Sequence, residues 1–412
     1  MGSRETSPAQ DYKALMERLE TLPSCTLLTT GRTGTDLLQS LLDSHPEVLT
    51  FNGRLAFHSF WRKSVCVAAG SFVAQDLVDE FIGNHIEAFK SRYDLQERKH
   101  QLGDDSDQSI DIDLEAFRSH ALGLLDEVEV NSRTALLAIC GAYALCLGQD
   151  LELKGLFFHH AHHFRELPDY LSDFPDSKII SMTRDPRANF VSGIEHHRDN
   201  NYWRDTDTGR HLFYYIDRIL KDASPVERYG KEYRVVRIED LGRVEILQAL
   251  AGWLGIAYDE SMTRSTWAGL SWRGDRLSKV NDAPGFSAKM LENRWESRLS
   301  FTDKYVMNYV MNPRLKRYGY SHGRAGLLGA IIVPFLILLP LSYEYRFISP
   351  RYLRDRLRKG QFGIVVRNAQ SYVRRIRVFL KYYVRTTARR KFQQPVLTAE
   401  SATNVTTTAG ES

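Results

Sequence analysis

Two short polar segments, each directly after an apolar run, constrain the fold of this chain more than any other feature. The first, residues 29–35 (Thr-Thr-Gly-Arg-Thr-Gly-Thr), follows the apolar run 25–28 and precedes leucines at helical spacing from Leu37. This order predicts a strand, a tight turn and the N-terminus of a helix. Gly31 and Gly34 let the backbone approach an anion closely, and the turn also carries three side-chain donors, Arg32, Thr33 and Thr35. The segment therefore predicts a phosphate-binding loop.

The second segment begins at Arg184 and reads Arg-Asp-Pro-Arg-Ala-Asn-Phe-Val-Ser, so that Ser192 lies eight positions after the first arginine. It follows an apolar run, residues 178–183, that predicts another strand. A kinase-type phosphate loop would need Gly-Lys-Ser/Thr at the start of its helix, and no lysine occurs between Gly31 and Ser40. An ATP-binding loop is therefore disfavoured, although a nucleotide kinase stays an alternative.

Taken together, the two segments resemble the donor site of the sulfotransferase family. Residues 29–35 look like the loop that holds the 5′-phosphosulfate of 3′-phosphoadenosine 5′-phosphosulfate (PAPS), and Arg184 with Ser192 looks like the motif for its 3′-phosphate. Later segments, among them residues 236–241, are similar to bacterial and carbohydrate-type domains, so the resemblance covers roughly residues 20 to 320. It implies an α/β fold, a three-layer sandwich with a central parallel sheet, and direct transfer from PAPS as co-substrate without a metal.

The resemblance also implies a role for each residue of these motifs. Arg32 would contact the bridging and 5′-phosphate oxygens of the donor, because a guanidinium can bind two oxygens at once. The 3′-phosphate, which distinguishes PAPS from ATP, would bind the second motif. The residues expected to hold the donor are Gly31, Arg32, Thr33, Gly34, Thr35, Arg184 and Ser192. Asp36, where many family members have threonine, is expected to face the acceptor or an arginine of the loop.

A cluster of four histidines, at positions 159, 160, 162 and 163, follows the strand predicted at residues 151–158. Cytosolic sulfotransferases place their catalytic histidine at this point, and an imidazole with a pKa of about 6.5 suits removal of a hydroxyl proton. The spacing from Arg184 favours His162 as the general base, whereas closeness to the strand end favours His160. Glu195 is the alternative, since other branches of the family use a glutamate. No metal site is expected, because no carboxylate or cysteine lies at ligand spacing within the cluster.

A further 3′-phosphate loop of the family has two candidate locations. Residues 358–363 (Arg-Lys-Gly-Gln-Phe-Gly) match its Arg-Lys-Gly-x-x-Gly pattern, but they lie beyond the end of the catalytic domain. We interpret this match as chance. The loop is instead expected within residues 272–294, where Arg273, Arg276 and Lys279 are the candidate ligands.

The pattern of apolar and polar residues divides the chain into five parts. Strands predicted near residues 25–28, 151–158, 178–183 and 233–238 alternate with helices, which indicates a parallel sheet with its ligands at the carboxyl ends of the strands. The predicted parts are an N-terminal helix and extension (1–20), the sulfotransferase domain (21–322, with a helical insertion at about 54–148), a hydrophobic membrane-inserting segment (323–342), a basic amphipathic tail (343–392) and a disordered end (393–412).

The net charge of +4 conceals an asymmetry between the tail and the rest of the chain. Residues 343–392 carry 15 Lys and Arg against Glu344 and Asp355, a net charge of +13, which leaves −9 for the remainder. This distribution argues against nucleic-acid binding by the folded domain. The four cysteines lack Cys-x-x-Cys spacing and residues 1–10 contain no apolar stretch, so we expect reduced thiols and a cytoplasmic catalytic domain.

The uncharged segment 325–342, rich in Leu, Ile and Val, has a length at the lower limit for a membrane span of ~30 Å, and Pro334 lies near its centre. Since both flanks favour the cytoplasm, we expect a bent, re-entrant or monotopic insertion. Behind it, apolar residues such as Phe379 and basic residues such as Arg377 occupy different faces of a predicted helix, which is typical of a helix lying on anionic lipid. A buried core helix and a helix docked on the domain are the respective alternatives.

These observations predict a membrane-associated enzyme that transfers the sulfuryl group of PAPS to a hydroxyl of a lipid or glycan. The acceptor class follows from the expected location rather than from residues of a pocket. A nucleotide kinase-like enzyme and a non-catalytic nucleotide-binding membrane protein are the alternatives, and the histidine cluster argues against the second. The sequence does not predict the oligomeric state.

Overall fold

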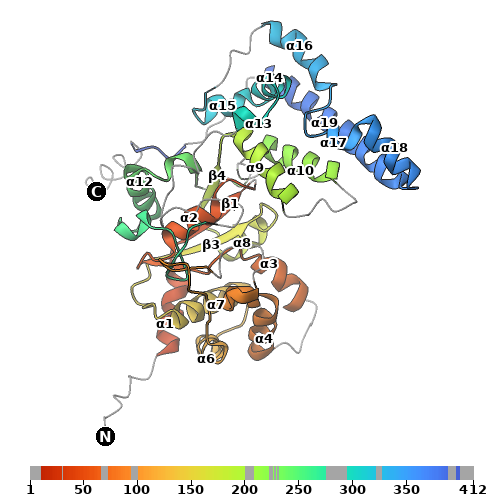
Figure 1. Cartoon of the computed structure of the whole chain (residues 1–412). Helices are drawn as coiled ribbons and strands as arrows, with labels where there is room; N and C mark the ends of the chain where they lie inside the picture. Colours follow the sequence, from red (N-terminus) through yellow and green to blue (C-terminus); the bar gives the residue numbers. More distant parts are fainter. Residues whose placement is uncertain are drawn as a thin grey trace.

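The computed structural model of the chain describes residues 11–29, 31–65, 73–93, 101–199, 208–221, 226, 229, 232–274, 295–321, 327–387 and 396–399. Within the helices, the side chains of residues 196–199, 208–214 and 385–387 lie outside this description. A sheet occupies the centre of the molecule, and the last helices of the chain extend from one side of it (Figure 1).

The central sheet has five strands, all parallel, in the order β2-β3-β1-β4-β5. The strands are β1 Ser24–Thr29, β2 Val48–Thr50, β3 Leu156–His162, β4 Lys178–Thr183 and β5 Tyr233–Arg237. Almost every side chain of the three middle strands is buried, as expected for strands covered on both faces. The predicted α/β fold with a parallel sheet is confirmed. Because β1 lies between β3 and β4, the loop that leaves its carboxyl end is flanked by the ends of both neighbours.

The strand that carries the histidines differs from its prediction. β3 begins at Leu156 rather than at Leu151 and continues to His162. The preceding segment turns instead, with the amide of Lys154 donating to the carbonyl oxygen of Leu151 (3.2 Å) and its ammonium donating to that of Val48 (2.9 Å). The histidines expected after the strand therefore lie at its carboxyl end. β2 was not predicted, because three residues are too few to show an alternating pattern.

Helices of the insertion cover one face of the sheet. Phe157 of β3 packs there in one apolar cluster with Phe81 and Leu136. Side-chain caps fix the helix starts, since Asp113 and Asn131 each accept hydrogen bonds from the first amides of the helix that follows. The elements on this side are α1 Tyr12–Thr21, α3 Phe57–Phe60, the π-helical turn η1 Trp61–Val65, α4 Ala74–Asn84, α5 Ile86–Phe89, η2 Ser91–Tyr93, α6 Leu114–Leu125 and α7 Ser132–Cys146.

The opposite face of the sheet is covered by α2 (Thr35–Leu42) and α12 (Val244–Leu254). Phe158 packs on this side with Leu38 and Leu250, because consecutive side chains of a strand point to opposite faces. The remaining elements of this part are α8 Leu167–Asp173, α9 Pro186–Asp199, α10 Thr208–Lys221, η3 Ile238–Asp240, η4 Glu260–Thr263 and the antiparallel pair β6 Thr266–Trp267 and β7 Leu270–Ser271.

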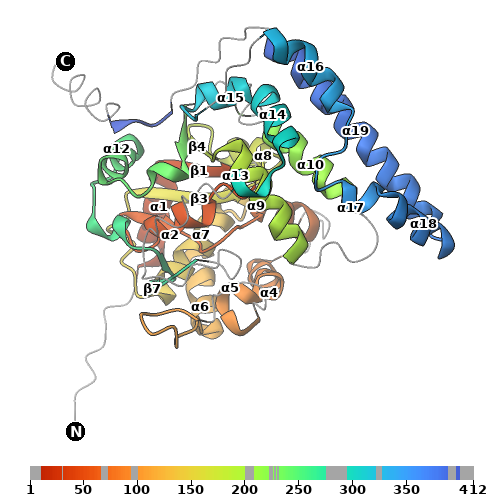
Figure 2. The same cartoon turned by 45° about the horizontal axis from the view of Figure 1, so that its top comes forward.

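The chain after residue 294 forms a layer of helices against α9 and α10 (Figure 2). In this layer Phe379 and Tyr382 of the long last helix are buried together with Val310 and Ile337. The apolar face of that helix therefore packs on the domain, as the docked-helix alternative expects. The helices are α13 Trp295–Arg298, α14 Phe301–Val310, α15 Asn312–Arg317, α16 Leu327–Ile337, α17 Tyr345–Ile348, α18 Pro350–Arg358 and α19 Phe362–Thr387.

A buried ion pair connects the long helix to the layer beneath it. Arg375 of α19 is 1% exposed, and its guanidinium lies 2.9 Å from the carboxylate of Glu344. It also donates to the carbonyl oxygen of Leu339 (2.9 Å) and contacts that of Ile337. A buried charge needs such a complete set of partners, because desolvation alone would cost several kcal/mol. The pair thus fixes α19 against the end of α16.

The predicted membrane-inserting segment forms α16, which contains Pro334 and ends at Ile337. In the part of the chain that the structure describes, no helix combines the length and the apolar character that a membrane crossing needs.

The last described residues return to the sheet. The amide of Leu397 donates to the carbonyl oxygen of Val235 (2.9 Å), and Val396 forms a parallel bridge with the same residue. Val396 and Leu397 therefore lie beside the edge strand β5, so the disorder predicted for residues 393–412 does not hold at these two positions. Leu397 is buried in the apolar cluster under α12, which gives this contact its physical reason.

Candidate active site

The predicted phosphate loop leaves β1 at Thr29 and turns sharply before α2. Gly31, Arg32 and Gly34 have left-handed backbone conformations, with φ angles of 100°, 54° and 85°. Glycine adopts such angles without strain, whereas a non-glycine residue is held there only by its surroundings. The hydroxyl of Thr29 accepts a hydrogen bond from the amide of Gly31 (2.8 Å) and pairs with the hydroxyl of Thr33. Thr30 lies outside the described residues.

The helix that follows the loop starts where the sequence predicts it. Its first internal hydrogen bond runs from the amide of Leu38 to the carbonyl oxygen of Gly34 (3.0 Å). The first amides of any helix, here including that of the buried Thr35, have no carbonyl acceptor within the helix. These amides and the positive end of the helix dipole attract an anion. Gly34 has to stay small, because a Cβ atom there would lie 2.3 Å from the side chain of Ile238.

Tyr215 of α10 clamps the loop to the second motif. Its hydroxyl donates to the carbonyl oxygen of Gly31 (3.0 Å) and contacts the amide oxygen of Asn189 on α9. Its ring packs directly on Gly193, where a Cβ atom would come within 2.1 Å. Sequence reasoning missed Tyr215, since a tyrosine on an amphipathic helix is usually a packing residue. The one sequence feature that could have pointed to Tyr215 is its partner Asn189, a polar residue within the second motif.

Three arginines, Arg32, Arg184 and Arg218, surround this clamp. Burial raises the pKa of the Tyr215 phenol, and all three guanidinium groups oppose that rise, so each lies within electrostatic reach of one hydroxyl. Burial lowers the pKa of Arg184, and the neighbouring Arg32 lowers it further, whereas Glu239 raises it. This concentration of positive charge suits a ligand with several phosphate or sulfate groups.

Arg218 is a site residue that the sequence did not predict. A Cβ atom on Gly31 would lie 3.9 Å from its guanidinium carbon, and its Nη2 atom lies 3.4 Å from Nδ1 of His163. Burial lowers the pKa of Arg218, and the nearby Arg54 and Arg165 lower it further. Arg218 therefore lies between the loop and the histidines. No local pattern marks it, because it reaches the site only through the packing of α10 on α9.

The start of the second motif is held by the segment after β5. The carboxylate of Glu239 accepts from the amide of Asp185 (3.0 Å) and from the hydroxyl of Tyr320 (2.8 Å). Arg187 binds both carboxylate oxygens of Asp185, at 2.7 and 3.0 Å, which makes it a structural residue of the turn. Arg184, which precedes this turn and is half-buried, lies within electrostatic reach of Glu239, of Arg32 in the loop and of Tyr215. The structure thus brings the two predicted motifs together.

His160 and His162, the two predicted bases, lie beside the first turns of α2. Nδ1 of His160 is 2.8 Å from Oε1 of Gln39, and its Nε2 is 3.0 Å from Nδ1 of His162. The carboxylate of Asp36, expected to face the acceptor or an arginine of the loop, lies 3.8 Å from Nδ1 of His160. His160 is buried and His162 is partly exposed.

An irregularity of β3 places His162. Thr26 of β1 is opposite His159 but Leu28 is opposite His162, so β3 has one extra residue in this interval. His162 has a φ of 65°, which is rare for a residue other than glycine and is often found at functional sites. Burial lowers its pKa well below the usual range, and His160 and His163 lower it further. His162 is therefore neutral at neutral pH, as a general base has to be.

The other histidines and the acidic alternative have different surroundings. His159 is buried and stacks on Tyr170 with ring centroids 5.2 Å apart, so it belongs to the core. Burial and the nearby arginines lower the pKa of His163 to about 4. Glu195 on α9 forms an ion pair with Arg298 of α13 (3.5 Å).

The remaining predicted ligands are only partly described. Ser192 lies half-buried on α9, eight residues after Arg184 as predicted. Arg273 contacts the carbonyl oxygen of Asp104, a residue of the insertion that belongs to neither motif. Arg276 and Lys279 fall outside the described residues.

Comparison with known families decides which family the chain belongs to. A model of the sulfotransferase family matches residues 26–259, which is more than half of the 412 residues. The chain belongs to the sulfotransferase family. The resemblance inferred from the two motifs is thereby confirmed, and the enzyme is a PAPS-dependent transferase. The match does not determine the acceptor.

Among solved structures, the sulfotransferase domain of the olefin synthase from Synechococcus PCC 7002 is similar to this sulfotransferase. The two are 18% identical, the alignment covers 67% of this chain and 87% of that chain, and the TM-score is 0.37. A likeness at this level supports no inference about the acceptor. Comparison with curated proteins gave no match.

The observed loop fits the donor that the family implies. Gly31 leaves open the space between the loop, Tyr215 and Arg218, which a Cβ atom would enter at 3.5 Å from the tyrosine ring. Arg32 and Arg184 carry the charges that a 5′-phosphosulfate and a 3′-phosphate need. Within the described ranges, no group of three or more His, Cys, Asp or Glu side chains is arranged to hold a metal ion.

Replacing Gly34 by alanine tests the construction of the loop. We expect Gly34→Ala to lower the free energy of unfolding by about 2–4 kcal/mol, because its φ is left-handed and the new methyl group meets Ile238. Binding of 3′-phosphoadenosine 5′-phosphate (PAP) should weaken at least ~10-fold as the loop shifts. Denaturant unfolding and calorimetry measure the two effects.

The matched control is Gly252→Ala in α12, where nothing lies within 4 Å of the added Cβ atom. This variant should keep PAP affinity and gain up to ~1 kcal/mol, because alanine is the better helix former. Equal behaviour of the two variants would contradict the proposed tight packing at Gly34.

Proposed function

We propose that this sulfotransferase transfers the sulfuryl group of PAPS in line to a hydroxyl of a lipid or glycan acceptor, on a three-layer α/β fold. The observation that carries the proposal is the convergence of Arg32, Arg184 and the histidine pair around one loop. A kinase would not need a 3′-phosphate site, and a non-catalytic nucleotide-binding protein would not need a neutral, partly exposed histidine beside it.

Two groups of residues hold the donor, one after β1 and the other after the neighbouring strand β4. The loop Gly31–Thr35 and the first amides of α2 bind the 5′-phosphosulfate, and Arg184 with Ser192 binds the 3′-phosphate. Tyr215 keeps these groups in register, since it contacts both the loop and α9. PAPS supplies an activated sulfuryl group with PAP as its leaving group.

The chain's own residues then have three tasks in the transfer. Arg32 stabilises the negative charge that develops on the departing phosphate, and Arg218 adds positive charge between the loop and the histidines. One histidine of the pair His160 and His162 removes the proton of the acceptor hydroxyl. The fixed spacing of loop and strand ends orients the acceptor oxygen for in-line attack.

The donor assignment predicts that the enzyme binds PAP at least tenfold more tightly than AMP, because charge-assisted hydrogen bonds to the 3′-phosphate contribute about 1.5–3 kcal/mol. Arg184→Ala should remove this preference while AMP affinity stays within a few-fold. Calorimetry on the full-length protein measures both affinities.

Arg243→Ala, which removes an exposed arginine after β5, is the control and should keep the preference. Equal affinities of the wild type for PAP and AMP would exclude PAPS as the donor.

A membrane location of the enzyme is the second part of the proposal. One side of α16 is exposed and apolar, with Leu327, Ile331 and Phe335 exposed to 83%, 59% and 69%, and Leu338 continues it. The opposite side is buried at Val333 against the neighbouring helices. A patch of this kind is typical of a surface that inserts shallowly into a bilayer.

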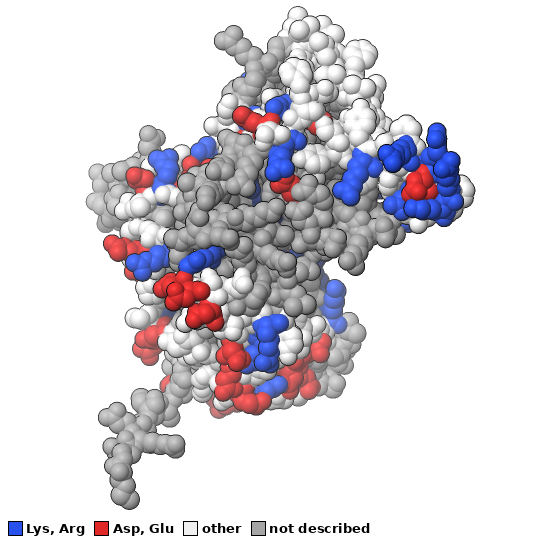
Figure 3. Space-filling model, viewed as in Figure 1, with Lys and Arg blue, Asp and Glu red and all other residues white. Residues whose placement is uncertain are grey.

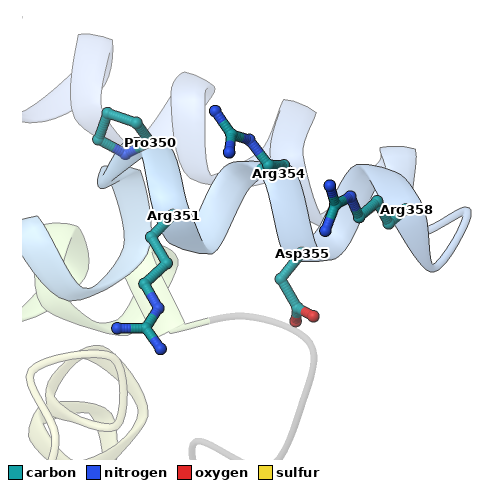
Figure 4. Close-up of a pocket in the computed structure, with 5 residues that line it drawn as sticks. All are labelled: Pro350, Arg351, Arg354, Asp355 and Arg358. Carbon is teal, nitrogen blue, oxygen red and sulfur yellow. The ribbon is translucent and has the colours of Figure 1, made fainter.

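Basic side chains gather on another helix of the same layer, α18. Figure 3 displays uncharged atoms over α16 and a dense group of Lys and Arg over α18. There a cavity of about 570 Å³ is lined by Arg351, Arg354 and Arg358 together with Pro350 and Asp355 (Figure 4). Each arginine of α18, which packs on α19 as α16 does but near the other end of that helix, would add about 1 kcal/mol of attraction to anionic headgroups. We therefore propose a monotopic enzyme on an anionic membrane surface, which is why a lipid or lipid-linked glycan is the proposed acceptor.

The cytoplasmic side is proposed for the catalytic domain, because PAPS is made in the cytosol and the described cysteines are free thiols. Cysteine-accessibility labelling near residues 320 and 395 in intact cells should reach both positions from the cytoplasmic side only. Labelling of the two positions from opposite sides would indicate a span and overturn this topology.

The membrane proposal predicts that the full-length protein sediments with vesicles containing phosphatidylglycerol and less with pure phosphatidylcholine. The double variant Ile331→Asp, Phe335→Asp should weaken the partition at least tenfold, because each apolar side chain contributes about 1.5–3 kcal/mol when buried. Salt at 1 M should weaken binding of the wild type, since the Debye length falls to ~3 Å.

Leu153→Asp combined with Val244→Asp is the matched control, because these apolar residues are also exposed but lie on other elements. If this control loses vesicle binding as strongly as the α16 variant, or if neither does, α16 is not the membrane contact.

A further inference from the structure

Three side chains from two elements form a continuous hydrogen-bonded chain beside the phosphate loop. Oε1 of Gln39 in α2 lies 2.8 Å from Nδ1 of His160, whose Nε2 lies 3.0 Å from Nδ1 of His162. Gln39 and His160 are almost completely buried, at 0% and 1% exposure, and His162 is partly exposed. The chain therefore leads from the core to the surface of the site.

The orientation of the Gln39 amide fixes the protons of this chain. Its Nε2 atom donates to the carbonyl oxygen of Phe51 (2.6 Å), so the atom facing His160 is the acceptor Oε1. Nδ1 of His160 must then carry the proton, and the Asp36 carboxylate 3.8 Å away on the same side can likewise only accept. The other nitrogen of His160, Nε2, is left with a lone pair.

His162 has the complementary arrangement. Because Nε2 of His160 is an acceptor, Nδ1 of His162 donates to it across 3.0 Å. In a neutral imidazole only one nitrogen carries hydrogen, so Nε2 of His162 has the free lone pair. The extra residue in β3 and the left-handed backbone at His162 hold its ring in this place.

We propose that Gln39 and His160 are positioning residues that hold His162 in one tautomer, and that Nε2 of His162 is the general base. This inference rests on the proposed sulfuryl transfer and resolves which histidine of the pair receives the proton. His160 is thereby a positioning residue, because its own nitrogens are both occupied within the chain.

Under this assignment, each proton and electron pair of the transfer has a defined destination. The acceptor O–H bond breaks and its proton goes to Nε2 of His162, while the acceptor oxygen forms a bond to sulfur. The bond between sulfur and the 5′-phosphate oxygen breaks, and its electron pair stays on the phosphate near Arg32. His162 can pass its Nδ1 proton to Nε2 of His160, which moves the positive charge toward the carboxylate of Asp36.

The surroundings of His162 set the pH at which the chain works. The charged and titratable groups near it are His160 of its own strand, His163 directly after that strand, Arg54 in the segment after β2 and Arg218 of α10. Burial, followed by these neighbours, lowers its pKa well below the usual range. The active form is the neutral one, so turnover should stay level around neutral pH and fall only when the pH drops through this lowered pKa.

The first test observes the tautomers directly and does not depend on turnover. Ring nitrogens of the full-length protein labelled with ¹⁵N in histidine are observed by NMR at pH 7.5, and His160→Gln and His162→Gln assign the two rings. We expect both rings to carry hydrogen on Nδ1. A proton on Nε2 of His162 in the wild type would overturn the proposal, whether or not the protein proves to transfer sulfate.

The second test uses PAP release from PAPS, with water as the only acceptor and again with a total membrane lipid extract. His162→Gln should lower turnover ~10²-fold or more while PAP affinity stays within a few-fold. His160→Leu should lower it at least ~10-fold, and His160→Gln should recover most of the loss, because an amide oxygen can accept the Nδ1 proton of His162.

Gln39→Met, which keeps the volume but removes the acceptor, should mix the tautomers of His162 and lower turnover by ~10-fold. His120→Asn is the control, since His120 contacts Tyr12 in the insertion and should leave turnover unchanged. Wild-type turnover in both His162→Gln and His160→Leu would exclude the pair and make Glu195 the next candidate. If the NMR result holds but the wild type consumes no PAPS, the proposed sulfuryl transfer fails and the hydrogen-bonded chain stands.

Discussion

Because β1 lies between β3 and β4, the loop at its carboxyl end meets histidines on one side and an arginine on the other. A parallel sheet brings all these strand ends to one edge, so groups more than a hundred residues apart need no further device to meet. The remaining parts serve this edge: α2 supplies amides and Gln39, α10 supplies Tyr215 and Arg218, and the segment after β5 supports Arg184. If β1 lay at an edge of the sheet, the donor loop at its end would be far from either the histidines of β3 or the arginine after β4.

The sequence predicted the parts of the site that are encoded by neighbouring residues. The turn at residues 31–34 was predictable because glycine spacing and the following helix repeat are local properties, and Arg184 was predictable because it follows a strand of clear composition. Gln39, Tyr215 and Arg218 were not, since each lies on a helix whose pattern says only which face is buried. The extra residue of β3 is invisible in sequence because it exists only relative to the pairing with β1.

The same limit explains the C-terminal helices. The sequence predicted lipid contact for both the segment 323–342 and the helix behind it, but the apolar side chains of that helix pack mainly in the layer with α10, whereas α16 within the first segment keeps an exposed apolar side. An amphipathic pattern gives the direction of a face and not the identity of what covers it. The buried Arg375 illustrates this point, because it lies in the arginine-rich stretch but is bound within the layer by Glu344 and by the carbonyl oxygen of Leu339.

Val396 and Leu397 pair with Val235, so a later segment of the same chain covers part of the edge strand β5. β5 would otherwise be an open edge, a row of unused amide and carbonyl groups that can recruit the edge of another molecule. Leu397 is also buried in the apolar cluster beneath α12, so this segment packs on the catalytic domain as well as pairing with its sheet. Shortening the protein to its family-matched region would therefore leave backbone groups of β5 at Val235 unpaired and uncover the apolar cluster beneath α12.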